Sequence, residues 1–261
     1  MRLALVVEYD GSRFFGWQLQ KESDNTVQFA VEQALARVAD HPVRVHCAGR
    51  TDTGVHATGQ VIHFDTQAER DSIAWVRGTN VNLPDTVVIR AAKQVDSEFH
   101  ARFSAQRRRY RFVIFNRDVR PTFLAYRTTW FYRPLDESRM QQAADALMGK
   151  HDFTSYRAVA CQAKSPVRTI HELTITRQNH YVFIDVEADG FLHHMVRNLA
   201  GVLMAIGCGK QPVDWAREVL ESRDRTLGGV TAQPFGLYLT HVTYPEQYNI
   251  PRLGEGSPVW G

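Results

Sequence analysis

The stretch Ala48-Gly-Arg-Thr-Asp-Thr-Gly-Val-His-Ala-Thr-Gly-Gln-Val61 is the most informative part of the sequence. It places one carboxylate, Asp52, in a glycine-rich loop between strand-like runs at 43–47 and 60–64. Glycines at this spacing allow tight bends or the close approach of another backbone. A carboxylate on such a loop can face a ligand, and Arg50 can face a phosphate or a base. The alternative is that Asp52 only caps a bend.

Composition is that of a globular protein with a buried core. The chain has 261 residues, 44% hydrophobic and 23% charged, enough for one large domain or two small ones. The apolar start of the chain is too short for a secretory signal and predicts a first strand instead. The longest nearly apolar stretch, 199–208, is about half a membrane span. Three widely spaced cysteines argue against a disulfide framework, which suits the cytoplasm.

Positive charge is concentrated in one segment. Residues 101–133 contain nine arginines and one acid, a net charge of +8, so the rest of the chain carries −5 within a total of +3. Nine aromatic residues are interleaved with the arginines, a composition typical of surfaces that bind phosphates and stack on unpaired bases. The alternative is a solvated strand face whose aromatic side chains belong to the core.

Hydrophobic periodicity gives the same order of elements twice. Strands are predicted at 3–9, 43–47, 60–65 and 86–95 with helices at 26–39 and 71–78, and then strands at 108–116, 171–177, 181–188 and 236–243 with helices at 136–148 and 193–206. An inserted helix is expected near Trp215. Each half matches the split β-α-β pattern. We therefore predict an α+β fold in which two ferredoxin-like β-α-β-β-α-β units form one extended antiparallel sheet with a central RNA-binding cleft.

Two helix starts carry capping signals. Asn25 followed by Gln28 resembles a capping box, and Asp136 is the expected N-cap of the helix at 136–148, which should end at Gly149. The predicted domains are residues 1–103, which carry the Asp52 loop, and 104–261, which carry the basic strand and the Arg197 helix.

Arg197 is an unusual residue within the helix at 193–206. At 100° per residue it points away from the apolar stripe, yet its neighbours on that side are small or apolar. An arginine in such surroundings needs a carboxylate partner, because an unpaired buried charge is very costly. Asp52 is one candidate, and pairing would keep it ionised as a nucleophile requires. Asp185 or Glu187 is the alternative partner.

Tyr110 lies on the basic strand at 108–116. Strand alternation places it on the face of Phe112 and Ile114, opposite Arg109 and Arg111. Such a phenol can stack on a base. The alternative is a core tyrosine with a hydrogen-bonded hydroxyl.

Motifs for cofactors and metals are weak. The glycine spacing fits neither a dinucleotide fingerprint nor a phosphate-binding loop, so no cofactor is predicted. His46, Cys47, His56 and His63 lack metal-ligand spacing, so no metal site is predicted. Two alternative functions stay open on these residues. One is a non-catalytic RNA-binding module, and the other is a metal-dependent nuclease that uses Asp52 with His56 or His63.

Several motifs in one order resemble a known family. Gly49-Arg-Thr-Asp-Thr-Gly-Val-His-Ala57 is similar to the signature of the TruA family of tRNA pseudouridine synthases, and the resemblance covers nearly the whole chain. It includes the motifs Glu8-Tyr-Asp-Gly-Ser-Arg-Phe-Phe-Gly-Trp-Gln18, Asn80-Val-Asn-Leu-Pro84, Phe99-His-Ala-Arg-Phe-Ser104, Arg108-Arg-Tyr-Arg111, Asp152-Phe-Thr-Ser155, Phe191-Leu-His-His-Met-Val-Arg-Asn198 and Gly236-Leu-Tyr-Leu239. Thr53 stands where the family commonly has alanine, a difference we expect to be tolerated.

The resemblance implies a specific reaction and specific roles. It implies isomerisation of uridine to pseudouridine at positions 38, 39 and 40, in the anticodon arm of tRNAs, by a homodimer that binds tRNA. Asp52 would be the nucleophile, Tyr110 would contact the target base and Arg197 would pair with Asp52. Arg50 would help to hold the flipped nucleotide, and Leu237 would line the pocket.

Overall fold

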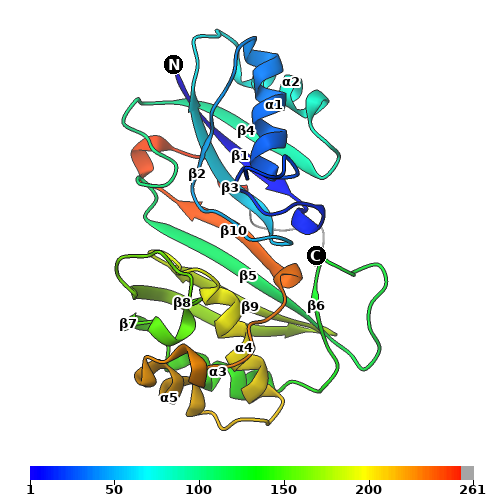
Figure 1. The fold of residues 1–261 in the computed structure, drawn as a ribbon, viewed down its shortest axis with the longest axis vertical. Coiled ribbons are helices and arrows are strands. Elements are labelled where there is room, and N and C mark those ends of the chain that lie inside the picture. The colour runs from blue at the N-terminus through cyan, green and yellow to red at the C-terminus, as the bar shows by residue number, and fades with distance from the viewer. Residues whose placement is uncertain (254–261) are drawn as a thin grey trace. The chain divides into compact units, whose positions relative to one another are not determined.

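The computed structural model describes residues 1–253 and divides them into two compact units. The first comprises Met1–Arg108 and the chain from Tyr238 on, and the second comprises Arg109–Leu237. Both mix helices with strands, which confirms the predicted α+β class (Figure 1). The expected division into residues 1–103 and 104–261 stays a prediction, because compactness alone does not define a segment that folds by itself.

The first unit has the strand order of a split β-α-β fold. Its strands are β1 (Arg2–Tyr9), β2 (His46–Cys47), β3 (His56–Asp65), β4 (Val87–Val95) and, from Tyr238 on, β10 (Leu237–Thr243), and its helices are α1 (Val27–Ala39) and α2 (Ser72–Asn82). The sheet order is β4-β1-β3-β10. Strand β1 pairs antiparallel with β3 and β4, and β2 pairs antiparallel with β3. Strand β10 pairs parallel with β3 at Tyr238 and Leu239. Strand β3 thus pairs with both β1 and β2, which α1 connects, and this is the split β-α-β arrangement of ferredoxin-like units.

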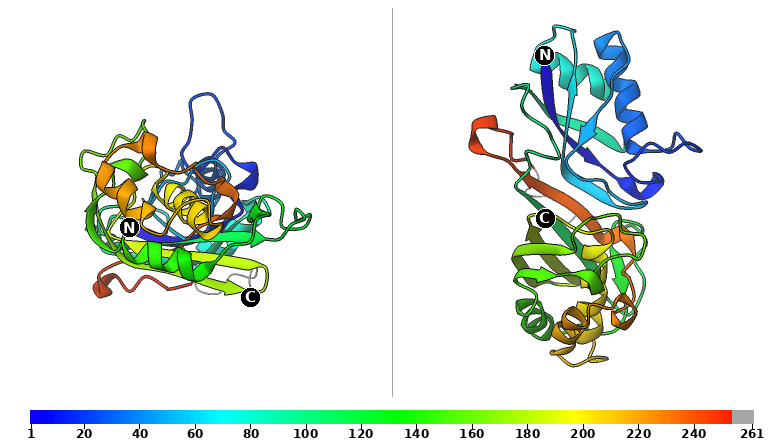
Figure 2. Two further views of the ribbon diagram at one scale, coloured as in Figure 1. Left: turned by 90° about the horizontal axis from the view of Figure 1, so that it is seen from below. Right: turned by 60° about the vertical axis from the view of Figure 1, so that its left-hand side comes forward.

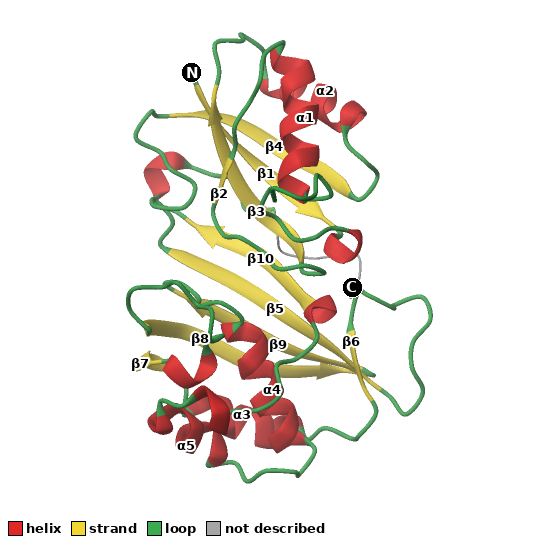
Figure 3. Ribbon diagram, in the orientation of Figure 1, coloured by secondary structure: helices red, strands yellow, loops and turns green. Residues whose placement is uncertain are grey.

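Helices α1 and α2 pack against each other on one face of this sheet (Figure 3). Helix α1 begins one residue later than the capping-box pattern predicted, because the side chain of Thr26, not of Asn25, accepts from the Phe29 N–H. The amide of Asn25 donates instead to the Arg13 carbonyl. The helices approach closely at Gly78, where a Cβ would lie 3.1 Å from a methyl group of Val38.

The second unit contains elements that the sequence predicted and two short strands that it did not. It comprises β5 (Arg107–Asn116) from Arg109 on, β6 (Thr129–Phe131), β7 (Gly149–Asp152), β8 (Val167–Gln178), β9 (Tyr181–Ala188), α3 (Glu137–Asp145), α4 (Met195–Gly207) and α5 (Trp215–Ser222). Its sheet order is β5-β9-β8-β7, with β6 parallel to β5. The chain also forms five short 3-10 helices within residues 1–253: Gly11–Arg13, Thr154–Tyr156, Arg225–Leu227, Pro234–Gly236 and Glu246–Tyr248.

Local signals explain most of the element boundaries in this unit. Asp136 caps α3 by accepting from the Arg139 N–H, as predicted. Helix α3 ends at Asp145 rather than at 148, and Gly149, at φ +89°, opens strand β7 instead of following the helix directly. The β8–β9 hairpin turns at Asn179, which takes φ 54°. Helices α3, α4 and α5 pack against one another (Figure 2).

Two further expectations concern cysteines and membranes. Cys47, Cys161 and Cys208 are all free, as their spacing predicted. Within residues 1–253, no helix has both the length and the apolar character needed to cross a membrane.

Three histidine rings, those of His46, His63 and His100, contact one another at the first unit's sheet. The ring of His63 lies 4.5 Å from that of His100 and 5.1 Å from that of His46, measured between centroids. The His63 side chain is buried, and its Nδ1 accepts from the Ala101 N–H at 3.1 Å. Burial, followed by the positive charge of neighbouring His100 and Arg2, lowers the pKa of His63 to about 4.

We expect acid to destabilise the protein partly through His63. Between pH 6.5 and pH 4 the unfolded chain protonates this histidine while the folded chain keeps it neutral, so the free energy of unfolding falls as the pH falls. The loss is on the order of 3 kcal/mol. Urea unfolding at pH 7 and pH 4.5 measures it, comparing His63→Gln with His171→Gln, which changes an exposed histidine. Equal acid sensitivity in the wild type and both variants would contradict this assignment.

Candidate active site

Asp52 lies in the turn that joins β2 to β3. The Val55 N–H donates to the Asp52 carbonyl at 3.1 Å, and Gly54 takes φ +80°, a conformation that favours glycine. The Asp52 side chain is half-buried, whereas Arg50 and Thr53 on either side of it are exposed. The loop therefore presents its carboxylate at a partly sheltered position.

A neighbouring segment holds this turn by backbone contact. A Cβ on Gly11 would lie 1.9 Å from the Val55 carbonyl oxygen, and one on Gly16 would lie 2.7 Å from the Thr51 carbonyl oxygen. Gly16 also has φ +82°. The Trp17 N–H donates to the Thr51 carbonyl at 3.0 Å. The backbone around 11–17 thus packs directly on the backbone of the Asp52 loop.

Buried polar side chains fix the other side of the loop. Gln60 Nε2 donates to the Gly49 carbonyl at 2.6 Å, and the Tyr9 hydroxyl and Thr51 Oγ1 lie 2.8 Å apart. Gln60, Tyr9 and Thr51 are all buried, so these bonds are shielded from water. Reasoning from the sequence missed all of these supports. The only signal for them was the motif at 8–18, which the family resemblance included.

The side chain of Arg197 is held by a loop of the same unit, which follows α5. Its Nε donates to the Ala232 carbonyl at 2.8 Å, and the Ala232 N–H donates back to the Arg197 carbonyl at 3.1 Å. Helix α4 is buried around most of its circumference, which confirms that the far side of the helix does not face water. The alternative carboxylate partner Asp185 binds Arg111 through both oxygens, each at 2.8 Å.

The loop reaches α4 because Gly201 lacks a side chain. A Cβ there would lie 1.9 Å from the Val230 carbonyl oxygen. One turn earlier on the helix, the buried Asn198 amide oxygen accepts from Arg225 Nη2 at 3.0 Å and from Thr231 Oγ1 at 2.7 Å. Residues 225–232 therefore form a strap over α4, and this strap orients Arg197.

Tyr110 is 8% exposed and packs its ring edge-on against Phe191, with centroids 4.9 Å apart. The predicted alternation along β5 is confirmed. Arg109 forms two hydrogen bonds with Glu172, at 2.8 and 2.6 Å, and Arg111 binds Asp185. These two arginines therefore form ion pairs within the protein, which sequence reasoning could not foresee because both partners are more than 60 residues away.

Leu237 begins β10 and is buried. It follows a tight approach at Gly236, where a Cβ would lie 2.4 Å from the Val113 carbonyl oxygen. Asp52 and Arg50 thus belong to the first unit, and Tyr110, Arg197 and Leu237 to the second. That all five act at one site stays a prediction.

The histidines considered for a nuclease have other roles. His56 and His63 are seven residues apart on β3, about 23 Å along an extended strand. The Nδ1 of His56 accepts from the Gly11 N–H and that of His63 from the Ala101 N–H, each at 3.1 Å. His56 also stacks on Tyr238, with ring centroids 4.5 Å apart. Both rings are buried supports of the fold, which disfavours the nuclease interpretation.

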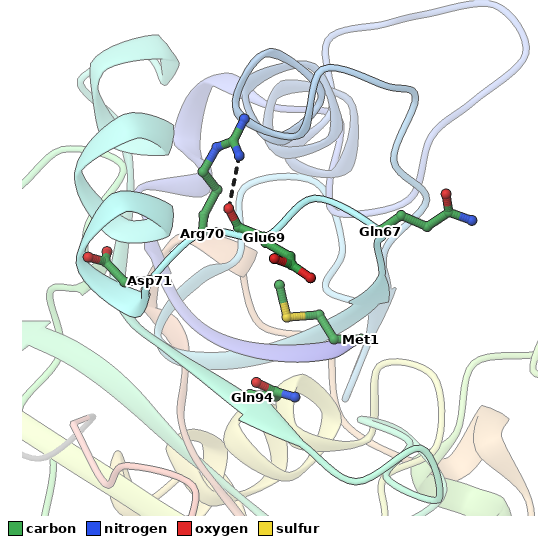
Figure 4. A pocket seen from close by; sticks show the side chains of 6 residues that line it. All are labelled: Met1, Gln67, Glu69, Arg70, Asp71 and Gln94. Atoms are coloured by element: carbon green, nitrogen blue, oxygen red, sulfur yellow. Dashed lines mark hydrogen bonds between the residues drawn. The ribbon is translucent and has the colours of Figure 1, made fainter.

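A cavity of about 520 Å³ lies elsewhere on the first unit (Figure 4). It is lined by the polar residues Gln67, Glu69, Arg70, Asp71 and Gln94 together with Met1. Met1 precedes β1, whereas Tyr9, which contacts the Asp52 loop through Thr51, ends β1. Eight residues of extended strand, about 26 Å, separate these two ends. The cavity is therefore distinct from the surroundings of Asp52.

Comparison with known proteins shows the class to which this fold and this loop belong. Residues 5–104 and 143–245 match the sequence profile of the family described as tRNA pseudouridine synthase. The match covers well over half of the chain and includes the Asp52 loop, the Arg197 helix and all of β10. The chain belongs to the tRNA pseudouridine synthase family, whose members are isomerases.

Individual relatives are similar over nearly the full length. The chain is 55% identical to tRNA pseudouridine synthase A of Pseudomonas aeruginosa over 250 residues, covering 96% of this chain and 88% of the relative. It is 53% identical to the protein of the same name from Shewanella loihica over 256 residues, and 54% identical to that from Shewanella piezotolerans, with 98% of both chains covered in each case. These matches confirm the resemblance that the motifs indicated.

Proposed function

We propose that this protein isomerises uridine to pseudouridine at positions 38, 39 and 40 in the anticodon stem-loop of tRNAs. It would act in the cytoplasm as a homodimer and without a cofactor. The observation that carries the proposal is the Asp52 loop, which lies within the family match and is held by buried backbone contacts at Gly11 and Gly16.

The proposed architecture joins the two units into one extended antiparallel sheet with a central RNA-binding cleft. Each unit supplies part of the machinery: Asp52 and Arg50 come from the first, and Tyr110, Arg197 and Leu237 from the second. The strand order of the first unit and the strand pairing of the second support two ferredoxin-like halves.

Each residue has a role that fits its surroundings. Asp52 is the nucleophile, and Arg197 pairs with it. Tyr110, buried on an apolar face, contacts the target base, and Leu237 lines the pocket around it. Arg50 is exposed, as a side chain that holds the flipped nucleotide must be.

The chemistry requires no redox step. The C–N glycosidic bond breaks, the uracil turns, and C5 bonds to the same sugar carbon; C5 then loses its proton and N1 takes up a proton from water. The Asp52 carboxylate stabilises the intermediate, either by attack on the sugar or by assisting loss of a sugar proton. Apolar walls exclude water while the base turns. Removing a base from its stack costs on the order of a few kcal/mol, which contacts from Arg50 offset.

A direct test uses purified protein and a tRNA transcript with no added cofactor. Tritium at C5 of uridine is released to water when C5 bonds to the sugar, so we expect tritium release together with pseudouridine mapped to positions 38–40. A parallel reaction with chelator should proceed equally and leave the strand intact. Strand cleavage that stops with chelator would favour the nuclease, and binding without tritium release would favour the RNA-binding module. Light scattering of the same sample tests the homodimer.

The strap over α4 leads to a separate prediction. Gly201→Ala should improve helix propensity by about 1 kcal/mol, yet its Cβ would force the Val230 carbonyl away and release the Ala232 contacts to Arg197. We expect kcat to fall about 10²-fold because Arg197 is displaced, with little change in tRNA affinity.

The matched control for Gly201→Ala is Gly190→Ala. A Cβ at Gly190 would meet only the flexible end of Arg168, at 3.4 Å. Steady-state kinetics and filter binding measure the two effects, and normal kcat in Gly201→Ala would reject the role of the strap.

A further inference from the structure

A segment between β5 and the start of α3 carries exposed aromatic side chains. We call residues 117–133 the arm; most of it is the extended loop that leads into β6 in Figure 3. Phe123 is 93% exposed, Tyr126 61% and Tyr132 55%. Large exposed aromatic side chains close together in the chain are uncommon on a surface that contacts only water. The proposed chemistry at Asp52 makes no use of them.

The arm is held in place at its base. Strand β6 pairs with β5, and the Asn116 amide donates to the carbonyls of Phe131 and Arg133 at 2.9 and 2.7 Å. Near its tip, the Thr128 N–H donates to the Leu124 carbonyl at 3.2 Å, and the Tyr126 ring packs edge-on against Phe235. The exposed Phe123 ring is thus presented by an ordered turn.

The arm also holds arginines that are free of carboxylate partners. Within residues 1–253, Arg117, Arg120 and Arg133 form no ion pair with an acid. Arg117 donates to backbone carbonyls, and Arg133 donates to the Tyr132 hydroxyl at 3.1 Å. This differs from β5, where Arg109 and Arg111 are held by Glu172 and Asp185. The arm therefore holds positive charge that is still available to a polyanion.

We propose that the arm is a second RNA-binding surface, which contacts the tRNA away from the reacting uridine. The Phe123 ring stacks on an unpaired base, and Arg120 and Arg133 bind phosphates. This inference rests on the proposed function, because it assumes that tRNA is the substrate. RNA fits better than a second copy of the chain, since contact between two arms would bring together surfaces of the same positive charge.

The test measures tRNA affinity and single-turnover rate separately. Phe123→Ala should raise the Kd for a tRNA transcript about 10-fold, as the loss of one stacked base does, and leave the rate at saturating RNA unchanged. Phe123→Trp should keep near-normal affinity because it supplies another ring. Val159→Ala, which shortens an exposed side chain outside the arm, is the control.

Charge is tested with the double variant Arg120→Ala/Arg133→Ala. We expect weaker tRNA binding. The slope of log Kd against log salt concentration should also fall by about one to two, because up to two phosphate contacts are lost. Arg37→Ala, an exposed arginine on α1, should keep the wild-type slope.

If the wild type forms pseudouridine but Phe123→Ala and Arg120→Ala/Arg133→Ala bind tRNA with unchanged affinity, the inference about the arm is overturned and the proposed function stands. A wild type that neither binds tRNA nor forms pseudouridine would overturn the proposed function instead. Light scattering of Phe123→Ala gives a further outcome that would overturn RNA binding by the arm. This outcome is a variant that is monomeric where the wild type is a dimer, and that binds tRNA as tightly as the wild type at matched dimer concentration. The arm would then be assigned to contact between copies of the chain.

Discussion

Asp52→Asn should reduce tritium release from C5-labelled tRNA by at least about 10³-fold while tRNA affinity stays within about threefold of the wild type. The amide keeps the size of the side chain but cannot act as a nucleophile, so the loss falls on the chemical step. The side chain is only half-buried and the loop is fixed through its backbone, so the substitution should leave the fold intact.

Three measurements make the outcome decisive. Single-turnover assays at saturating tRNA report the rate, filter binding reports the affinity, and urea unfolding reports the fold. Asp24→Asn, an exposed aspartate of the same unit, should behave as the wild type in all three. Substantial turnover in Asp52→Asn would remove Asp52 from the role of nucleophile.

Gly16→Ala should cost at least about 10²-fold in activity, because a methyl group there would lie 2.7 Å from the Thr51 carbonyl oxygen and push the Asp52 loop away. The backbone also has φ +82°, so alanine adds strain of about 1 kcal/mol or more. We expect reduced kcat together with a lower free energy of unfolding.

Gly209→Ala is the matched control for this second prediction. Gly209 has φ +74°, close to that of Gly16, but a Cβ there would meet nothing within 4 Å. The backbone strain is therefore similar in the two variants, and only Gly16→Ala adds a clash with the loop. Kinetic assays and urea unfolding of both variants isolate that clash. Equal activity in the two would show that the segment around 11–17 does not position Asp52.

The sequence was a good guide wherever the signal was local. Helix α4, the β8–β9 hairpin and the Asp136 cap were all predicted, because periodicity and capping residues depend on near neighbours along the chain. The capping box at Asn25 was wrong by one residue, because Thr26 is also a favourable N-cap and the Asn25 amide binds the Arg13 carbonyl. Strands β6 and β7 were missed because each has at most four residues and is defined by its pairing partner.

Non-local pairing limited the prediction of the candidate site. Nothing in the segment 101–133 distinguishes arginines that bind acids of the protein from those that do not. Glu172 and Asp185, which hold Arg109 and Arg111, lie on other strands. The supports of the Asp52 loop were missed for the same reason. The contact of Gly16 with Thr51 joins segments 35 residues apart and leaves no periodic signal.

The way in which the Asp52 loop is fixed has a consequence for engineering new specificities. Its position depends on the backbone at Gly11 and Gly16 and on the buried Gln60, whereas the side chains of Arg50 and Thr53 are exposed. A library randomised at positions 50 and 53 should therefore yield many folded proteins that differ in their preferred nucleotides.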